Sequence, residues 1–199
     1  MTRVLFVLSC LCCWISSVQA QTLLVLGDSL SAGYQMQAEQ SWPALLNEKW
    51  RQQGGEHTLI NASISGETTQ GGLARLPALL ETHKPDWVLI ELGANDGLRG
   101  LPIADMEKNL ASMIRTIKAS GASVHLVGLR IPTNYGADYT GKFAAVYEKL
   151  AREYQTGFTP FLLAPIIHRP ELFQADGMHP TAEAQPLLMQ MVLKDLKIK

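Results

Sequence analysis

The sequence predicts an α/β fold in which helices cover both faces of a central parallel sheet of five strands. Three observations predict it. Short apolar runs alternate with longer amphipathic segments from Gln21 onward, no linker rich in proline or serine divides the chain, and the short runs are continuously apolar. Repetition of a strand followed by a helix implies right-handed crossovers and therefore a doubly wound sheet.

The expected elements follow one another along residues 21–199, which we interpret as a single domain. Strands are expected at residues 22–26, 57–62, 87–92, 123–129 and 158–162. Helices are expected at residues 42–53, 69–82, 103–120, 142–154 and 182–197. Because ligands of such sheets bind beyond the carboxyl ends of the strands, functional loops are expected at that edge.

The first 20 residues have the three parts of a secretory signal peptide. Arg3 supplies a positive start, residues 4–15 are almost uninterruptedly apolar, and Val18-Gln19-Ala20 is a small-x-small cleavage site. The alternatives are a membrane anchor, which needs about 20 apolar residues, and a lipoprotein attached through Cys10, which few residues precede. We expect cleavage after Ala20, a periplasmic or secreted location, and no stable membrane insertion of the mature chain.

Composition excludes several classes of protein. The chain has 17 Lys+Arg against 18 Asp+Glu, so it offers no basic surface to nucleic acid. Its hydrophobic content of 47% argues against a disordered chain. All three cysteines, Cys10, Cys12 and Cys13, lie in the segment expected to be removed. The mature chain then has no thiol, so any nucleophile must be an oxygen or an amine.

Small and polar residues follow each of the first three expected strands, at residues 27–33, 61–67 and 93–97. Ser29 stands beside Gly27 and Asp28 at a strand-to-helix turn, where the chain can bend sharply and present a hydroxyl group. Free N–H groups at the start of the next helix would point at the group that this hydroxyl attacks. An acyl-transfer nucleophile needs this geometry, although an ordinary helix N-cap would also explain Ser29.

A base and its orienting group are offered by Asp176-Gly177-Met178-His179-Pro180 near the carboxyl terminus. Pro180 disfavours a helical conformation at His179, so we expect the imidazole on an extended loop and Pro180 at the start of the last helix. Asp176 can fold back to accept a hydrogen bond from the other ring nitrogen. A capping aspartate and a solvent-facing histidine are the alternatives.

Three hydrogen-bond donors could stabilise an oxyanion at the same place. The Asn95 amide follows the third strand, Gly66 follows the second and can present a bare N–H, and the N–H of Ser29 is the third donor. Turn glycines and turn asparagines are common, which is the plainer interpretation. All these groups occur together in separate loops of one sheet, and this combination favours the catalytic interpretation.

Together these motifs resemble the SGNH-hydrolase (GDSL esterase) superfamily. The chain has GDSL at residues 27–30, a lone Gly66, GxND at residues 93–96 and DxxH at residues 176–179, in the family's order and approximate spacing. The resemblance covers essentially the whole mature chain and implies a flavodoxin-like three-layer α/β/α sandwich, in agreement with the sheet expected from the alternation of elements.

By the same resemblance Ser29 is the nucleophile, His179 the general base and Asp176 its orienter, while Ser29, Gly66 and Asn95 form the oxyanion hole. The implied activity is hydrolysis of acyl esters and thioesters through an acyl-enzyme on Ser29, as in acyl-CoA thioesterases, arylesterases and lysophospholipases. The implied protein is a monomer that acts on a small molecule and needs no cofactor. The alternatives are a carbohydrate O-acetyl esterase and a secreted module that binds acyl or glycan groups without turnover.

The same loops also suggest two other kinds of ligand site. Asp28 and Asp96 could hold divalent metals with His179, but the other expected histidine ligands are missing, so no metal is expected. A structural role, in which both carboxylates accept hydrogen bonds from backbone N–H groups, is preferred. Residues 27–33 also lack the G-x-G-x-x-G spacing of a dinucleotide site.

An acyl-binding groove is expected beside the catalytic loops, after the third and fourth strands. The apolar residues of 98–103 and of 131–139 are its candidates, represented by Leu98, Ile131 and Tyr135. Plain loop packing is the alternative for these residues.

Overall fold

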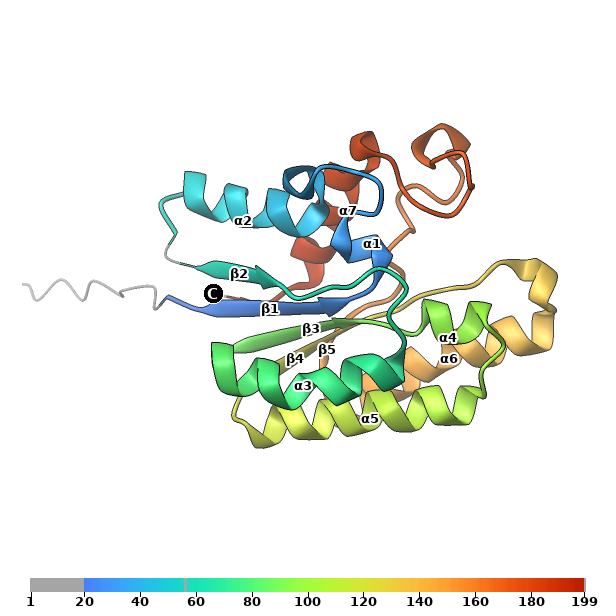
Figure 1. Ribbon diagram of the computed structural model, residues 1–199, viewed down its shortest axis with the longest axis horizontal. Helices are drawn as coiled ribbons and strands as arrows, with labels where there is room; N and C mark the ends of the chain where they lie inside the picture. Colours follow the sequence, from blue (N-terminus) through green and yellow to red (C-terminus); the bar gives the residue numbers. More distant parts are fainter. Residues whose placement is uncertain (1–19, 56, 199) are drawn as a thin grey trace, which may run out of the picture.

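The computed structural model describes residues 20–55 and 57–198, so the expected signal peptide lies, apart from Ala20, outside the described residues. One parallel sheet runs through the molecule in the order β2-β1-β3-β4-β5 (Figure 1). Its strands are β1 (Thr22–Gly27), β2 (Thr58–Asn61), β3 (Trp87–Glu91), β4 (Ser123–Val127) and β5 (Gly157–Thr159). The expected five-stranded parallel sheet is confirmed.

Seven α-helices lie among the described residues, and the long ones form the two outer layers of a three-layer sandwich. They are α1 (Ser29–Ala32), α2 (Trp42–Gln52), α3 (Thr69–His83), α4 (Ala94–Leu98), α5 (Ile103–Ala119), α6 (Ala137–Tyr154) and α7 (Gln185–Asp195). In Figure 1, α2 and α7 cover one face of the sheet, and α3, α5 and α6 cover the other. No described helix is both long and apolar enough to cross a bilayer.

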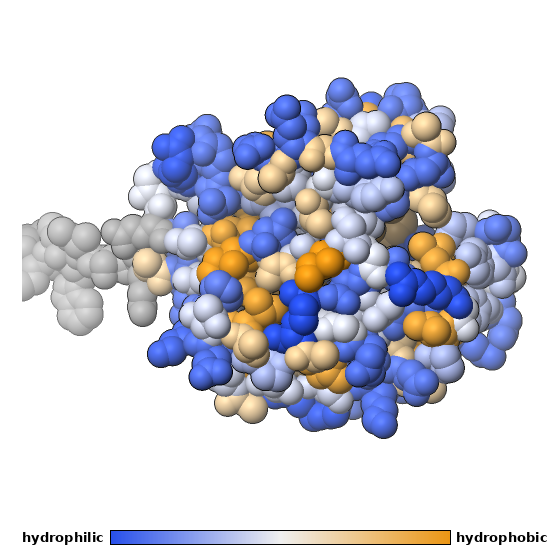
Figure 2. All heavy atoms as spheres, viewed as in Figure 1, coloured by the Kyte–Doolittle hydropathy of each residue, from blue (hydrophilic) through white to orange (hydrophobic). Residues whose placement is uncertain are grey.

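Burial explains the continuous apolar runs in the sequence. The central strands β1 and β3 are almost entirely buried, because helices cover them on both faces. The edge strand β2 is partly exposed, and Figure 2 shows apolar residues gathered over this region of an otherwise largely hydrophilic face. Because all five strands are parallel, their carboxyl ends lie at the same edge of the sheet.

The carboxyl-terminal part differs from the expectation, because Pro180 does not begin the last helix. It pairs with Phe173 in an isolated antiparallel bridge, and the flanking backbone of Thr181 donates to Leu172 O at 2.8 Å. A short 3₁₀ turn then leads to α7, and Pro186 takes the place in the first helical turn that does not need an N–H. The pairing around Pro180 holds the neighbouring His179 in an extended loop.

Two helices were not expected from the sequence at all. Helices α1 and α4 are four and five residues long, too short to show an apolar period. Helix α6 also begins at Ala137, five residues before the expected start at residue 142. Both short helices follow directly on strand ends, so they decide how the loops of the candidate site point.

Candidate active site

The nucleophile candidate is the first residue of α1, directly beyond the end of β1. The N-cap of this helix is Asp28, whose Oδ1 accepts a hydrogen bond from Leu30 N at 3.0 Å. The alternative in which Ser29 itself caps the helix is therefore wrong. With the capping done by its neighbour, the Ser29 hydroxyl is available to other partners.

That hydroxyl meets His179, which lies 150 residues away in the sequence. Ser29 Oγ is 2.9 Å from His179 Nε2, and His179 Nδ1 is 2.6 Å from Asp176 Oδ2. When Nδ1 carries its proton toward the carboxylate, Nε2 is left as the acceptor for the serine O–H. Serine, histidine and aspartate thus form one hydrogen-bonded line at the carboxyl edge of the sheet.

The loop that carries Asp176 also keeps it ionised. Its Oδ1 accepts hydrogen bonds from the backbone N–H groups of Met178 and His179, both at 2.9 Å. Desolvation opposes ionisation, but these bonds and the one from the imidazole outweigh it and lower the pKa of Asp176 to about 2. At neutral pH the carboxylate is therefore charged and able to stabilise an imidazolium.

Tyr34 and Gln174 support the histidine, and sequence reasoning missed both. The Tyr34 ring lies against the imidazole of His179, with 4.2 Å between ring centroids. Gln174 Nε2 donates to Tyr34 O at 2.9 Å and to Pro180 O at 3.0 Å, joining the nucleophile loop to the histidine loop. Neither residue belongs to a recognisable motif, so only the fold reveals this support.

The three expected oxyanion donors come from three loops of one edge. Gly66 has φ +80°, in the left-handed region that favours glycine, and Asn95 lies in the first turn of α4. Neither the Ser29 nor the Gly66 N–H donates to a protein acceptor among the residues that the structure describes. Both groups are therefore free to bind an oxygen.

Asn95 is bound differently from the other two donors. Its Nδ2 donates to Asp28 Oδ2 at 3.1 Å and to Glu67 O at 3.0 Å. An amide nitrogen has only two hydrogens, so both are engaged in this state. Asn95 therefore joins the loops after β1, β2 and β3, and it can donate to a substrate only by exchanging one of these bonds.

Gly93 allows α4 to begin where it does. Its φ of +122° is a conformation that side chains rarely adopt, and an added Cβ would lie 2.3 Å from Tyr147 Oη. That hydroxyl donates to Leu92 O at 3.0 Å, at the end of β3. Close packing under Gly93 thus turns the chain so that Asn95 faces the loops after β1 and β2.

The two remaining aspartates of the motifs are buried and bonded. Asp96 accepts from Thr69 N at 2.9 Å and from Thr69 Oγ1 at 2.5 Å, which fixes the start of α3. Desolvation by burial raises the pKa of Asp28 to about 6, despite the bonds from Leu30 and Asn95 that lower it. The described residues contain no group of three or more His, Cys, Asp or Glu side chains that could hold a metal ion.

The residues expected to line an acyl groove lie in the loops after β3 and β4. Tyr135 Oη donates to Leu98 O at 2.9 Å, and Tyr135 is 41% exposed. Ile131, by contrast, is buried and packs beneath Gly97. The structure thus brings Leu98 and Tyr135 together at the surface and places Ile131 in the core.

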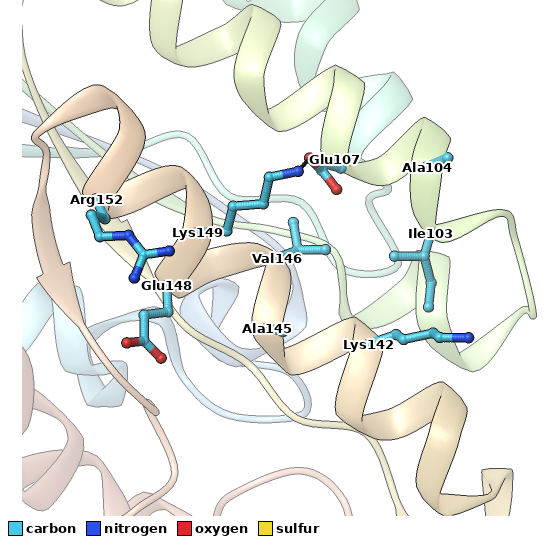
Figure 3. Close-up of a pocket in the computed structure, with 9 residues that line it drawn as sticks. All are labelled: Ile103, Ala104, Glu107, Lys142, Ala145, Val146, Glu148, Lys149 and Arg152. Atoms are coloured by element: carbon cyan, nitrogen blue, oxygen red, sulfur yellow. Dashed lines mark hydrogen bonds and ion pairs between the residues drawn. The ribbon is translucent and has the colours of Figure 1, made fainter.

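A separate groove lies on the outer helical layer, between α5 and α6 (Figure 3). It is open to solvent, has a volume of about 590 Å³ and is lined by apolar side chains such as Ile103 and Val146 with charged ones around them. Lys149 and Glu107 form an ion pair across it. None of the candidate catalytic residues lines this groove.

A serine, a histidine and an aspartate in one line at the carboxyl edge of a parallel α/β sheet form the arrangement of the serine hydrolases. The GDSL-like lipase/acylhydrolase family matches residues 25–186 of the chain. The protein belongs to this family, which confirms the expected class of ester hydrolase.

Named relatives extend the similarity to almost the full length. An arylesterase of Vibrio mimicus is 50% identical over 196 residues, which cover 98% of each chain. The thioesterase 1/protease 1/lysophospholipase L1 of Escherichia coli K12 is 48% identical over 178 residues, which cover 89% of this chain and 84% of the relative. A crystal structure of TesA has a TM-score of 0.86 at 47% identity and covers 89% of this chain and 98% of its own. The expected fold is confirmed.

Proposed function

We propose that the protein hydrolyses acyl esters and thioesters through a covalent acyl-enzyme on Ser29, with His179 as general base and Asp176 as its orienter. The observation that carries this proposal is the hydrogen-bonded line from Ser29 Oγ through the imidazole to the Asp176 carboxylate. The names of the relatives, an arylesterase and a thioesterase/lysophospholipase, support the substrate class.

The reaction has two halves. In the first, Ser29 Oγ attacks the acyl carbonyl while His179 Nε2 takes its proton, and the leaving alcohol or thiol departs with that proton as its bond to the acyl carbon breaks. In the second, water attacks the acyl carbon while His179 Nε2 takes a proton from it, the bond between the acyl carbon and Ser29 Oγ breaks, the carboxylic acid leaves, and His179 returns the proton to Ser29 Oγ. Asp176 keeps Nδ1 protonated and stabilises the imidazolium in both halves.

The oxyanion is held by the N–H groups of Ser29 and Gly66 and by Asn95 Nδ2. Since the Asn95 amide already donates to Asp28 and Glu67, binding the oxyanion exchanges one of these acceptors for the substrate oxygen. The developing negative charge makes this oxygen the stronger acceptor in the transition state. The exchange therefore favours the transition state over the bound ester.

For the acyl chain we place Leu98 and Tyr135 at the entrance of the binding groove and Ile131 in its supporting wall.

For the protein as a whole we propose a monomer that is exported through the signal peptide of residues 1–20 and acts outside the cytoplasm as one domain. If the protein were instead a carbohydrate O-acetyl esterase, it would prefer acetyl groups over longer chains. If it were a binding module, it would show no turnover.

The test is a chain-length series of p-nitrophenyl esters and acyl thioesters, hydrolysed by residues 21–199 and by the Ser29→Ala variant. Loss of a serine nucleophile lowers kcat by about 10⁶-fold in related chemistry. Ser120→Ala is the control, because this hydroxyl bonds only to Ile117 O at the end of α5. Full activity of Ser29→Ala, or an organophosphate attached to another residue, would refute the proposal.

A further inference from the structure

A buried carboxyl group lies directly beneath the nucleophile turn, and the proposed mechanism does not use it. Glu91 ends β3 and is 0% exposed. Its Oε2 accepts a hydrogen bond from Ser31 Oγ at 2.7 Å and one from Asp28 N at 3.3 Å. These two donors stand on either side of Ser29, so Glu91 holds the turn both before and after the nucleophile.

The same carboxyl group connects the turn to helices on that face of the sheet. Ser31 Oγ accepts from Trp42 Nε1 at 3.2 Å, and Trp42 N donates to Gln185 Oε1 at 2.9 Å. Trp42, Ser31 and Gln185 are all buried. One network of hydrogen bonds thus extends from β3 through α1 to the starts of α2 and α7.

Gly27 shows how closely this arrangement is packed. A Cβ at this position would lie 2.8 Å from Glu91 Oε2 and 2.8 Å from Ser31 Cβ, closer than real Cβ atoms come. The glycine that precedes Asp28 and Ser29 therefore leaves room for the contact between Glu91 and Ser31. The contact between Glu91 and Ser31 therefore depends on the first glycine of the nucleophile motif.

The surroundings of Glu91 favour the uncharged form of its carboxyl group. Glu91 is fully buried, and its Oε1 has no hydrogen-bond partner among the described residues. Burial, and then the negative charge of Asp28, raise the pKa of Glu91 well above its ordinary value. Oε2 serves as the acceptor for both donors.

We propose that Glu91 is a positioning residue for the reaction: its buried carboxyl group sets the place of Ser29 Oγ by accepting hydrogen bonds from Asp28 N and Ser31 Oγ. The proposal rests on the assignment of Ser29 as the nucleophile. A displacement of about 1 Å at a reacting group can cost about 10²-fold in rate. Loss of the acceptor should therefore act on kcat, while the surfaces that bind the substrate stay in place.

Two substitutions separate this role from mere filling of space. Glu91→Gln keeps an oxygen acceptor for both donors and stays neutral, so kcat should remain close to that of the unaltered protein. Glu91→Leu keeps similar volume without an acceptor, so kcat should fall by about 10²-fold with little change in KM. The rate at which an organophosphate modifies Ser29 should fall in parallel, because that reaction needs no acyl-binding groove.

Thr159→Val is the matched control. Thr159 is buried at the end of β5 and bonds to His125 at 2.9 Å. Strands β3 and β4 lie between β5 and the strand that leads to Ser29, so loss of this bond should lower stability and leave both rates unchanged. All variants are compared well below their unfolding midpoints. Should Glu91→Leu not fold, Ser31→Ala removes one of the two donors and should lower the same two rates.

The outcomes decide between the alternatives. Unchanged kcat and unchanged modification rate in folded Glu91→Leu or Ser31→Ala would overturn the positioning role. A loss in Glu91→Gln as large as that in Glu91→Leu would overturn the neutral acceptor. Full activity of Ser29→Ala would instead refute the proposed function itself, so the two failures are distinguishable.

Discussion

The candidate site has an exposed loop, which carries Asp176, and a buried floor, which contains Asp28 and Glu91. The two regions shift the pKa of a carboxyl group in opposite directions. Asp176 lies on an exposed loop, accepts three hydrogen bonds, and has a pKa lowered to about 2. Asp28 lies on the buried floor, accepts two, and has a pKa raised to about 6. Burial, together with the number of donors, decides whether the pKa of each carboxyl group lies above or below its ordinary value.

This difference in pKa shift corresponds to a difference in role within the site. On the exposed side, a charged aspartate can stabilise the imidazolium without costing the fold much, since water still reaches it. On the floor, Asp28 and Glu91 fix the backbone around Ser29, and burial makes their charge expensive. Substitutions on the loop should therefore change the rate, whereas substitutions on the floor should change both rate and stability.

The largest effect should come from the exposed side. Asp176→Asn keeps the shape of the loop but favours the wrong imidazole tautomer, and in a related triad such a change lowers kcat by about 10⁴-fold. The free energy of unfolding at pH 7 should change by far less than the activation free energy that this loss of kcat represents. Measurement of kcat on an aryl ester and of urea unfolding tests both parts.

Asp138→Asn is the control for this variant, because Asp138 is an exposed aspartate that is paired with Lys142 on α6 and lies outside the candidate site. It should leave kcat unchanged. A loss in Asp176→Asn no larger than that of the control would show that the loop carboxylate does not orient the base.

The second effect concerns Asn95, which bonds to the buried Asp28 and to the loop after β2. Asn95→Ala removes an oxyanion donor and also the bonds to Asp28 and Glu67, so kcat should fall by 10² to 10³-fold, roughly the loss of one such donor. Unlike Asp176→Asn, it should also lower the unfolding midpoint. Full kcat on esters in this variant would remove Asn95 from the oxyanion hole.

These particulars show how much of the site could be predicted from sequence. The fold was predictable from the alternation of apolar runs and amphipathic segments, and the nucleophile turn and the DxxH loop were predictable because each is a short local motif. The supports were not: Glu91 looks like the last residue of an apolar strand, and Tyr34 like any residue after a turn. Their roles depend on contacts between segments 60 to 140 positions apart, which no local pattern reports.

The misplaced start of the last helix has the same kind of cause. Pro180 and Pro186 are both suited to a first helical turn, and only the pairing of the Pro180 segment with Phe173 decides between them. Likewise, Ile131 and Tyr135 look alike as apolar loop residues, although one is buried and the other is exposed.

A third effect should appear in the pH dependence of stability. The folded state keeps a proton on Asp28 up to about pH 6, whereas the unfolded chain releases it near 3.8. The folded state therefore binds more protons in this window, and its stability falls as the pH rises through it, by about 3 kcal/mol for a shift of this size. Asp28→Asn should lack this contribution.

The measurement is urea unfolding of both proteins between pH 4 and 7. Their difference isolates Asp28 from other titrating groups such as His125, whose pKa burial lowers to about 4 and which destabilises the fold as the pH falls below 6.5. A difference that stays constant from pH 4 to 7 would mean that the floor does not penalise the charge.

The smallest effect should come from the acyl groove, and it again separates exposed from buried positions. Tyr135→Ala should shift the preferred acyl chain length by about tenfold in relative kcat/KM, as expected for altered apolar contact, and leave stability nearly unchanged. Tyr154→Ala, at the far end of α6 where Arg115 bonds to it, should shift nothing. Ile131→Ala should cost about 2–5 kcal/mol of stability, since it opens a cavity beneath Gly97. An unchanged chain-length profile in Tyr135→Ala would move the groove elsewhere, whatever the buried variant does.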